Sequence, residues 1–281
     1  MAPRIVNLNI PKGGTWLLGR CIELLTSCRP SLPRLVREGI LAAGEEPLWM
    51  LPLARFEQCL PCAPDEYLVG RVPYHPDWER ALIRAGYRGI FIVRDPRDLA
   101  VSRLHWVRKH PEAWPEAREL TDRQLLLAIL DASTLDAMGS KLTRVFAGRE
   151  VATRFCVPGA AMTLGRVYRA YLPWMDSPLC ETVRFEDLVG AAGGGSETAQ
   201  HAAIQRVAQQ AGVTLEPARI GAVAQRLFGS GSSYMNTFRR GHIGRWRDYF
   251  EPEHEERLRA VAGDVLERLD SHATGVRASA L

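Results

Sequence analysis

The chain has 281 residues, of which 46% are hydrophobic and 24% are charged, so it can bury a full core as an ordinary globular protein does. Its net charge of +4 suits a small anionic ligand, but no dense Lys/Arg block indicates a nucleic-acid partner. No apolar run is long enough to cross a bilayer, and no secretory signal precedes the first predicted strand. We therefore expect a cytoplasmic protein whose six cysteines are reduced thiols.

The beginning of the chain predicts an anion-binding turn. Residues 5–10 form an apolar run typical of a buried strand, and helical periodicity follows Thr15. Between them stands Pro-Lys-Gly-Gly-Thr, in which Lys12 adds a positive charge and Thr15 a hydroxyl donor. A strand that turns through glycines into a helix offers free backbone N–H groups and the positive end of the helix dipole to an anion. The lysine precedes the glycines, which is the reverse of a Walker A loop.

The next stretch predicts two helices and a long irregular connection. Helices are expected at 15–28 and 34–43, separated by a Pro-containing break at 29–33. Residues 44–66 are rich in Pro and Cys and are interpreted as an irregular wall of an acceptor site. Within them Cys59 and Cys62 form a lone CxxC, which we interpret as incidental, because no second pair stands at zinc spacing.

Charged residues follow several of the predicted strands. A strand at 67–72 leads to a turn at 73–76 and a helix at 78–85 with Asp77 as its N-cap. A strand at 88–93 leads to a helix at 97–109 that begins after Pro96. Because ligands bind beyond the carboxyl ends of strands in open α/β sheets, four residues are grouped as a candidate site: Lys12, Arg71, His75 and Arg94.

The second half of the chain predicts mainly helices. These are expected at 121–138, 163–175, 197–211, 216–227 and 251–269, with one further strand at 181–185 and flexible Gly-rich loops at 191–196 and 229–233. Strands alternating with helices predict an α/β fold with a central, mainly parallel sheet flanked by helices.

Three motifs, in order, resemble those of the PAPS-dependent sulfotransferases, where PAPS is 3′-phosphoadenosine 5′-phosphosulfate. Residues 11–15 resemble the family's Pro-Lys-Ser-Gly-Thr loop, and residues 94–102, Arg-Asp-Pro-Arg-Asp-Leu-Ala-Val-Ser, match its 3′-phosphate motif. Residues 239–246, Arg-Arg-Gly-His-Ile-Gly-Arg-Trp, resemble its closing loop. The resemblance implies a P-loop-like three-layer fold. It also implies transfer of a sulfuryl group from PAPS to a hydroxyl or amine of a small-molecule or glycan acceptor, without a metal. The length of the chain predicts a single domain over 1–281, and the last residues, 275–281, are predicted to be a disordered tail.

The resemblance also implies which residues bind the nucleotide. Arg94 and Ser102 correspond to the family's 3′-phosphate ligands, and Phe185 to an aromatic residue near the adenine. Trp16 stands one position earlier than the family's adenine-stacking tryptophan. The full set of implied nucleotide-binding residues is Lys12, Gly13, Gly14, Thr15, Trp16, Arg94, Ser102, Phe185, Arg239, Arg240 and Gly241.

The family's catalytic histidine is replaced in this chain. Family members carry this histidine in a segment such as Gly-His-Leu-Pro. The corresponding segment of this sequence is Gly-Arg-Val-Pro, with Arg71 in the histidine's place. A guanidinium cannot serve as a general base, so Arg71 either stabilises developing charge or holds an anionic acceptor. His75 is then our candidate for the base, and Lys12, Arg71 and His75 form the predicted catalytic set.

Two other functions stay open at this point. A P-loop nucleotide kinase or phosphotransferase would need a Walker A lysine and an acidic Mg²⁺ site, and the order of Lys12 and the glycines argues against it. A PAP-binding module without catalysis is suggested by Arg71. The Ala/Arg/Gly-rich composition is typical of a bacterial protein, and a homo-oligomer is compatible with the sequence.

Overall fold

The structure is a computed structural model that describes residues 4–41, 53–111, 115–131, 163–229 and 241–273. The chain forms two compact units, the first from Met1–Arg94 and Tyr171–Ile243 and the second from Asp95–Ala170 and Gly244–Leu281. Each unit is described by itself below. The single domain expected over 1–281 stays a prediction.

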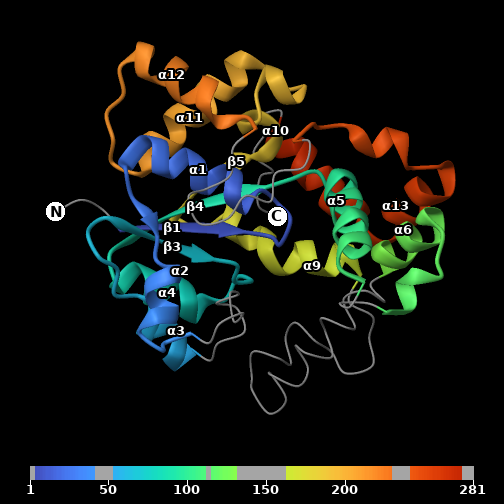
Figure 1. Ribbon diagram of the computed structural model, residues 1–281, viewed down its shortest axis with the longest axis horizontal. Coiled ribbons are helices and arrows are strands. Elements are labelled where there is room, and N and C mark those ends of the chain that lie inside the picture. The colour runs from blue at the N-terminus through green and yellow to red at the C-terminus, as the bar shows by residue number, and fades with distance from the viewer. Residues whose placement is uncertain (1–3, 42–52, 112–114, 132–162, 230–240, 274–281) are drawn as a thin grey trace. The chain divides into compact units, whose positions relative to one another are not determined.

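A parallel sheet forms the centre of the first unit (Figure 1). Over the described residues it has five strands in the order β2–β3–β1–β4–β5, and every neighbouring pair is parallel. The strands are β1 (Arg4–Asn9), β2 (Arg29–Pro30), β3 (Glu66–Gly70), β4 (Tyr87–Val93) and β5 (Cys180–Arg184). All of β1 after Arg4 is buried: Ile5, Val6 and Leu8 are apolar, and the polar residues Asn7 and Asn9 are buried with them. The predicted α/β fold with a parallel sheet is therefore confirmed.

Helices cover both faces of this sheet. Figure 1 shows α1 (Thr15–Thr26), α11 (Glu197–Gln210) and α12 (Pro217–Leu227) on one side, with α3 (Leu53–Cys59) and α4 (Pro76–Arg84) on the other. The first unit also contains the short elements α2 (Leu32–Arg37), η4 (Leu172–Met175), α10 (Phe185–Leu188) and η5 (Ala191–Gly193). The three layers of the predicted architecture are present.

The second unit is helical in its described part. Its elements are α5 (Pro96–Lys109), η3 (Pro115–Arg118), α6 (Asp122–Asp131), most of α9 (Leu164–Tyr171), η6 (Arg245–Asp248) and α13 (Pro252–Ala273). Fully buried His254 joins α13 to α6, since its Nε2 lies 3.1 Å from the carbonyl oxygen of Arg123. Gly165 lets α9 approach α13 closely, because a Cβ there would lie 1.9 Å from the carbonyl oxygen of Val261.

The break expected at 29–33 separates α1 from α2, and it also contains β2, which pairs with β3 at Arg29 and Pro30. Two local predictions were wrong. The connection expected to be irregular contains α3. The loop at 191–196 contains η5, whose buried Gly193 accepts a hydrogen bond from the backbone N–H of Ile243. The predictions for residues 132–138, 230–233 and 275–281 lie outside the described residues.

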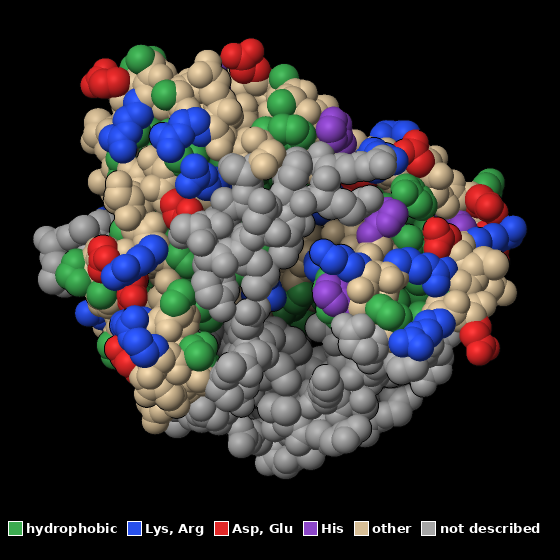
Figure 2. Space-filling view, viewed as in Figure 1, with side chains coloured by type: hydrophobic (Ala, Val, Ile, Leu, Met, Phe, Trp, Pro, Cys, Tyr) green, Lys and Arg blue, Asp and Glu red, His purple; other side chains and the backbone are tan. Residues whose placement is uncertain are grey.

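The surface shown in Figure 2 carries basic and acidic side chains interspersed with one another. None of the helices described here combines the length and hydropathy that crossing a bilayer requires. The described residues also contain no group of three His, Cys, Asp or Glu side chains that could hold a metal ion.

Candidate functional site

The turn between β1 and α1 has the backbone conformation of an anion cradle. Lys12 has a φ of 72°, in the left-handed region that costs a side-chain-bearing residue about 1–2 kcal/mol. Gly14, the N-cap of α1, has a φ of 117°. A Cβ on Gly14 would also lie 2.8 Å from Cδ1 of Ile92 and 2.9 Å from Cδ2 of Phe185. Glycine is therefore required there both by conformation and by space, and the predicted strand, turn and helix are present.

A buried polar network connects β1 to the first turn of α1. Asn7 Nδ2 donates to the carbonyl oxygen of Thr15 at 2.9 Å, and Asn9 Nδ2 donates to Asn7 Oδ1 at 3.0 Å. The Thr15 hydroxyl lies 2.5 Å from Asn9 Oδ1. Asn7 and Asn9 are completely buried and Thr15 nearly so. A satisfied network of this kind holds its members in one arrangement.

The network determines where the Thr15 proton points. A carbonyl oxygen can only accept, so Asn7 must present its amide nitrogen to Thr15 and its amide oxygen to Asn9. Asn9 must then present its own oxygen to Thr15, and the hydroxyl must donate to it. In this arrangement the Thr15 hydroxyl donates its proton to Asn9 and not to a ligand. The sequence had led us to expect a hydroxyl that donates to the ligand. Sequence reasoning missed Asn7 and Asn9, although two polar residues at alternate positions of an apolar strand are a signal.

Positively charged residues stand at the carboxyl ends of four neighbouring strands. Lys12 follows β1, Arg71 follows β3 and Arg94 follows β4. Arg184 is the last residue of β5 and is paired in register with Val93. Because parallel strands end at the same edge of a sheet, this row of cations lies along one edge, where α/β sheets bind ligands. The sequence grouped Lys12, Arg71 and Arg94 but missed Arg184.

Arg94 and Phe185 are brought together beside the cradle. The guanidinium carbon of Arg94 lies 4.2 Å from the centre of the Phe185 ring, and its Nη1 lies 3.4 Å from the carbonyl oxygen of Lys12. Phe185, the first residue of α10, is 7% exposed. Since Phe185 also packs against Gly14, the first unit unites four predicted site residues: Lys12, Gly14, Arg94 and Phe185.

Arg71 lies on the other side of β1, next to Trp16. Its guanidinium carbon is 5.4 Å from the centre of the indole ring, and Trp16 is only 8% exposed. The backbone at this position is held by two side chains. Tyr171 donates its hydroxyl to the carbonyl oxygen of Arg71 at 3.2 Å, and Trp174 donates Nε1 to that of Val72 at 2.9 Å. The stacking of Trp16 on adenine stays a prediction.

His75, and not Asp77, is the N-cap of α4. Nδ1 of His75 accepts the backbone N–H of Asp77 at 3.2 Å, and the His75 side chain is half-buried against Trp78. The prediction of Asp77 as the cap was wrong because a histidine nitrogen took the acceptor role. A neutral imidazole whose Nδ1 accepts a hydrogen bond carries its proton on Nε2. The role of His75 as general base stays a prediction, and this geometry argues against it.

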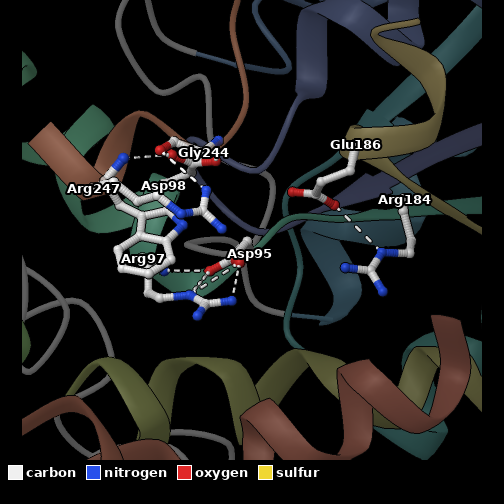
Figure 3. Close-up of polar contacts among 8 residues, drawn as sticks. Asp95, Arg97, Asp98, Arg184, Glu186, Gly244 and Arg247 are labelled. Carbon is white, nitrogen blue, oxygen red and sulfur yellow. Dashed lines mark hydrogen bonds and ion pairs between the residues drawn. The ribbon is translucent and has the colours of Figure 1, made fainter. Parts of the chain in front are cut away.

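Arg184 forms a local ion pair at the end of β5. Its Nε lies 3.5 Å from Oε2 of Glu186, on the first turn of α10 (Figure 3). Both side chains are mostly buried. This pair places one carboxylate within the row of strand-end cations.

In the second unit, the beginning of α5 is held by carboxylates. Asp95 caps the helix by accepting the backbone N–H of Arg97 at 2.8 Å, and it also pairs with the Arg97 guanidinium at 2.6 Å. The hydrogen bond that the Arg97 guanidinium donates to the Asp95 carboxylate is the main reason that the pKa of Arg97 is raised. Figure 3 shows the two side chains facing each other.

Asp98 ties α5 to residues 244–246. It is 3% exposed and accepts the backbone N–H groups of Gly244 at 2.7 Å and Trp246 at 3.1 Å. The Trp246 ring contacts two guanidinium groups, with the carbons of Arg97 and Arg247 at 4.3 and 4.6 Å from its centre. Asp98 and Arg97 thus hold the last residues of the third sequence motif, as Figure 3 shows for the polar contacts.

Of the remaining predicted site residues, two lie within the described part of the chain and two do not. Ser102 is half-buried on the second turn of α5. Gly241 has a φ of 66°, which favours glycine. Arg239 and Arg240 lie outside the described residues. The 3′-phosphate roles of these four residues and of Arg94 stay predictions.

The CxxC pair has the environment of structural thiols. Cys59 is buried, and Cys62 lies 3.0 Å from the hydroxyl of Tyr87. Burial raises the pKa of the Cys62 thiol, which is the opposite of what a reactive thiol needs.

Solved structures of three complexes resemble this chain in fold. A mouse sulfotransferase, SULT7A1, complexed with PAP has a TM-score of 0.57 at 15% identity, covering 92% of this chain and 82% of its own. Retinol dehydratase with androsterone and the inactive cofactor PAP has a TM-score of 0.52 at 16% identity, covering 93% of this chain and 80% of its own. Retinol dehydratase with retinol and PAP has a TM-score of 0.52 at 15% identity, covering 94% of this chain and 81% of its own. No family model and no curated protein matches the sequence, so these similarities establish the fold alone.

Proposed function

We propose that the chain is a sulfotransferase that moves the sulfuryl group of PAPS to a hydroxyl or amine of a small-molecule or glycan acceptor. The observation that carries the proposal is the joining of Lys12, Gly14, Arg94 and Phe185 at the carboxyl ends of β1 and β4. Three sequence motifs in the order of the PAPS-dependent enzymes support it, as does a fold shared with proteins solved in complex with PAP.

The residues present fit a nucleotide with phosphate groups. Glycines at 13 and 14 let an anion approach the backbone, and a Cβ at either position would lie 2.8 Å from a neighbouring atom. Arg94 offers a planar guanidinium whose face is packed on Phe185 beside the turn, and a guanidinium is the side chain that best matches the geometry of a phosphate. When bound, PAPS would supply an activated sulfuryl group attached to a phosphate that can leave.

The protein's part in the transfer is positioning and charge stabilisation. Lys12 and the backbone N–H groups of residues 14–16 stabilise the negative charge that develops on the departing phosphate, while the N–H of Gly13 closes the turn on the carbonyl oxygen of Ile10. Arg94 and Ser102, with Arg239, Arg240 and Gly241, select the 3′-phosphate and so distinguish PAPS from ATP. Thr15 contributes its backbone N–H and holds the turn to β1, because its hydroxyl donates to Asn9. A metal ion has no role in this scheme.

Replacing Lys12 tests the proposal. Lys12→Ala should lower PAPS turnover by about 10²–10³-fold, because a charge aimed at the leaving group is lost. Initial rates of PAP formation with an acceptor mixture measure this. Lys109→Ala, at an exposed position of α5, is the matched control and should keep full activity. Equal rates for Lys12→Ala and the unchanged protein would exclude the proposed role.

A further inference from the structure

We propose that the acceptor of this enzyme binds as a preformed oxyanion, held by Arg71 at the exit of β3, and that its hydroxyl is therefore acidic, as in a phenol. This inference rests on the proposed sulfotransferase function and names its acceptor class. It explains why the enzyme can carry an arginine at the position where a general base is expected.

Arg71 is a fixed donor at this position. Its guanidinium lies over the Trp16 indole on the first turn of α1, 5.4 Å from the ring centre, so the aromatic face holds it next to the cradle. The carbonyl oxygens of Arg71 and Val72 accept hydrogen bonds from Tyr171 and Trp174. A guanidinium keeps its proton at any physiological pH, so Arg71 can bind an oxyanion but cannot create one by accepting a proton.

His75 is a second donor at the same strand exit. Its Nδ1 accepts the backbone N–H of Asp77, so in the neutral ring the proton is carried by Nε2. Arg71 and His75, the two side chains assigned to the acceptor side, are thus both hydrogen-bond donors. Two donors complement an oxygen that has already lost its proton.

The strand order separates this donor pair from the nucleotide-binding arginine. β1 lies between β3 and β4, so Arg71 and Arg94 flank the Lys12 turn from opposite sides. Arg94 belongs with Phe185 and the proposed nucleotide position. We assign the β3 side to the acceptor, with the cation of Arg71 serving the acceptor's charge.

The proposed reaction balances without an enzyme base. The acceptor loses its proton to solvent before binding, and a lone pair of the resulting oxyanion forms the new S–O bond. The S–O bond to the 5′-phosphate breaks, and its electron pair remains on the phosphate oxygen beside Lys12. Arg71 stabilises the bound oxyanion and orients it, and no proton passes to the protein.

The first test measures the ionisation state of a bound acceptor directly. In a buffer at the pKa of 4-nitrophenol, half of this probe is the yellow phenolate. Adding excess protein, with and without PAP, should increase the phenolate absorbance, because the site binds the anion preferentially. Arg71→Met should abolish the increase and Arg71→Lys should keep part of it. Arg29→Met, at an exposed arginine of β2, should behave as the unchanged protein.

The second test compares acceptors in order of acidity. PAPS turnover should fall from 4-nitrophenol to phenol and be lowest with benzyl alcohol. Arg71→Met should lose about 100-fold in turnover of 4-nitrophenol while keeping its affinity for PAP. Arg71→His installs a base and should raise benzyl alcohol turnover by on the order of 100-fold.

The outcomes separate the two proposals. A phenolate absorbance that falls or does not change, or equal turnover of benzyl alcohol and phenol, overturns the oxyanion site. Loss of PAP affinity in Arg71→Met also overturns it, because Arg71 would then belong to the nucleotide site. A protein that raises the absorbance through Arg71 but does not bind PAP keeps the oxyanion site and overturns the sulfotransferase proposal.

Discussion

Thr15 illustrates how a single hydroxyl can stabilise a binding turn from the inside. Its hydroxyl donates a hydrogen bond to Asn9, and its carbonyl oxygen accepts one from the Asn7 side-chain amide. The side chain and the backbone of Thr15 are therefore both bonded to β1. The first backbone N–H groups of α1 are thereby aimed from a rigid support. Pre-organised donors of this kind are more effective than donors that must be ordered when the anion binds.

The role of this hydroxyl can be separated from a ligand contact. Thr15→Val removes the donor and leaves Asn9 Oδ1 buried without a partner, so the free energy of unfolding should fall by about 1–3 kcal/mol. Thr15→Ser should restore most of it. Urea unfolding of both variants without ligand measures the effect. If Thr15→Val kept full stability and lost only PAP affinity, the hydroxyl would instead serve the ligand.

At the scale of elements, Asp98 joins α5 to the last residues of the third motif. The sequence shows it only as one more charge in an Arg-Asp-Pro-Arg-Asp run. The structure buries it and gives it two backbone N–H groups from residues 244 and 246. Such charge-assisted bonds to a buried carboxylate are strong, and removing the acceptor leaves the donors unpaired.

Replacing this carboxylate should destabilise the protein. Asp98→Ala leaves the N–H groups of Gly244 and Trp246 without their acceptor and should cost about 2–4 kcal/mol in the free energy of unfolding. The midpoint of urea unfolding measures the loss. Asp264→Ala, which removes an exposed partner of Arg169, is the control and should cost less than about 1 kcal/mol. Similar losses in the free energy of unfolding for Asp98→Ala and Asp264→Ala would contradict the proposed role of Asp98 in joining α5 to residues 244–246.

The major elements follow from sequence patterns because their causes are local. The strand predicted at 88–93 is Tyr87–Val93, since a strand covered on both faces must be apolar along its length. The helix predicted after Pro96 begins at Pro96, which Asp95 caps. The glycine at position 14 was likewise predictable, because its φ of 117° is one that glycine adopts readily.

Other features depend on neighbours that the sequence does not reveal. β2 has two residues and no periodicity, and it exists because β3 offers a free edge. The meaning of Asn7 and Asn9 depends on Thr15 lying beside them in space. His75 became a helix cap through one hydrogen bond, which no residue pattern distinguishes from a catalytic position.

The stability of the whole molecule should depend on pH through its buried thiols. Burial raises the pKa of both Cys21 and Cys180 from 9.0 to about 12. Between these values the unfolded chain releases protons that the folded chain retains, so the free energy of unfolding falls as pH rises above about 9. Each thiol contributes a loss of about 1.4 kcal/mol per pH unit.

Replacing the two thiols should weaken this pH dependence. Urea unfolding at pH 8, 10 and 11 should show a smaller loss of stability in the double variant Cys21→Ala, Cys180→Ala than in the unchanged protein. Cys28→Ala, at a half-buried position, is the control and should keep the original slope. Parallel slopes for all three proteins would show that these thiols ionise equally when folded and unfolded.

The central claim is a nucleotide site that requires a 3′-phosphate, and calorimetric titration with PAP and with ADP tests it most directly. ADP has two phosphates at the 5′ position and none at the 3′ position, so it separates this site from that of a nucleotide kinase. Tight binding of PAP and negligible binding of ADP are expected. Equal or tighter binding of ADP would contradict it and favour a phosphotransferase, and binding of neither would show that the motifs do not form the proposed site.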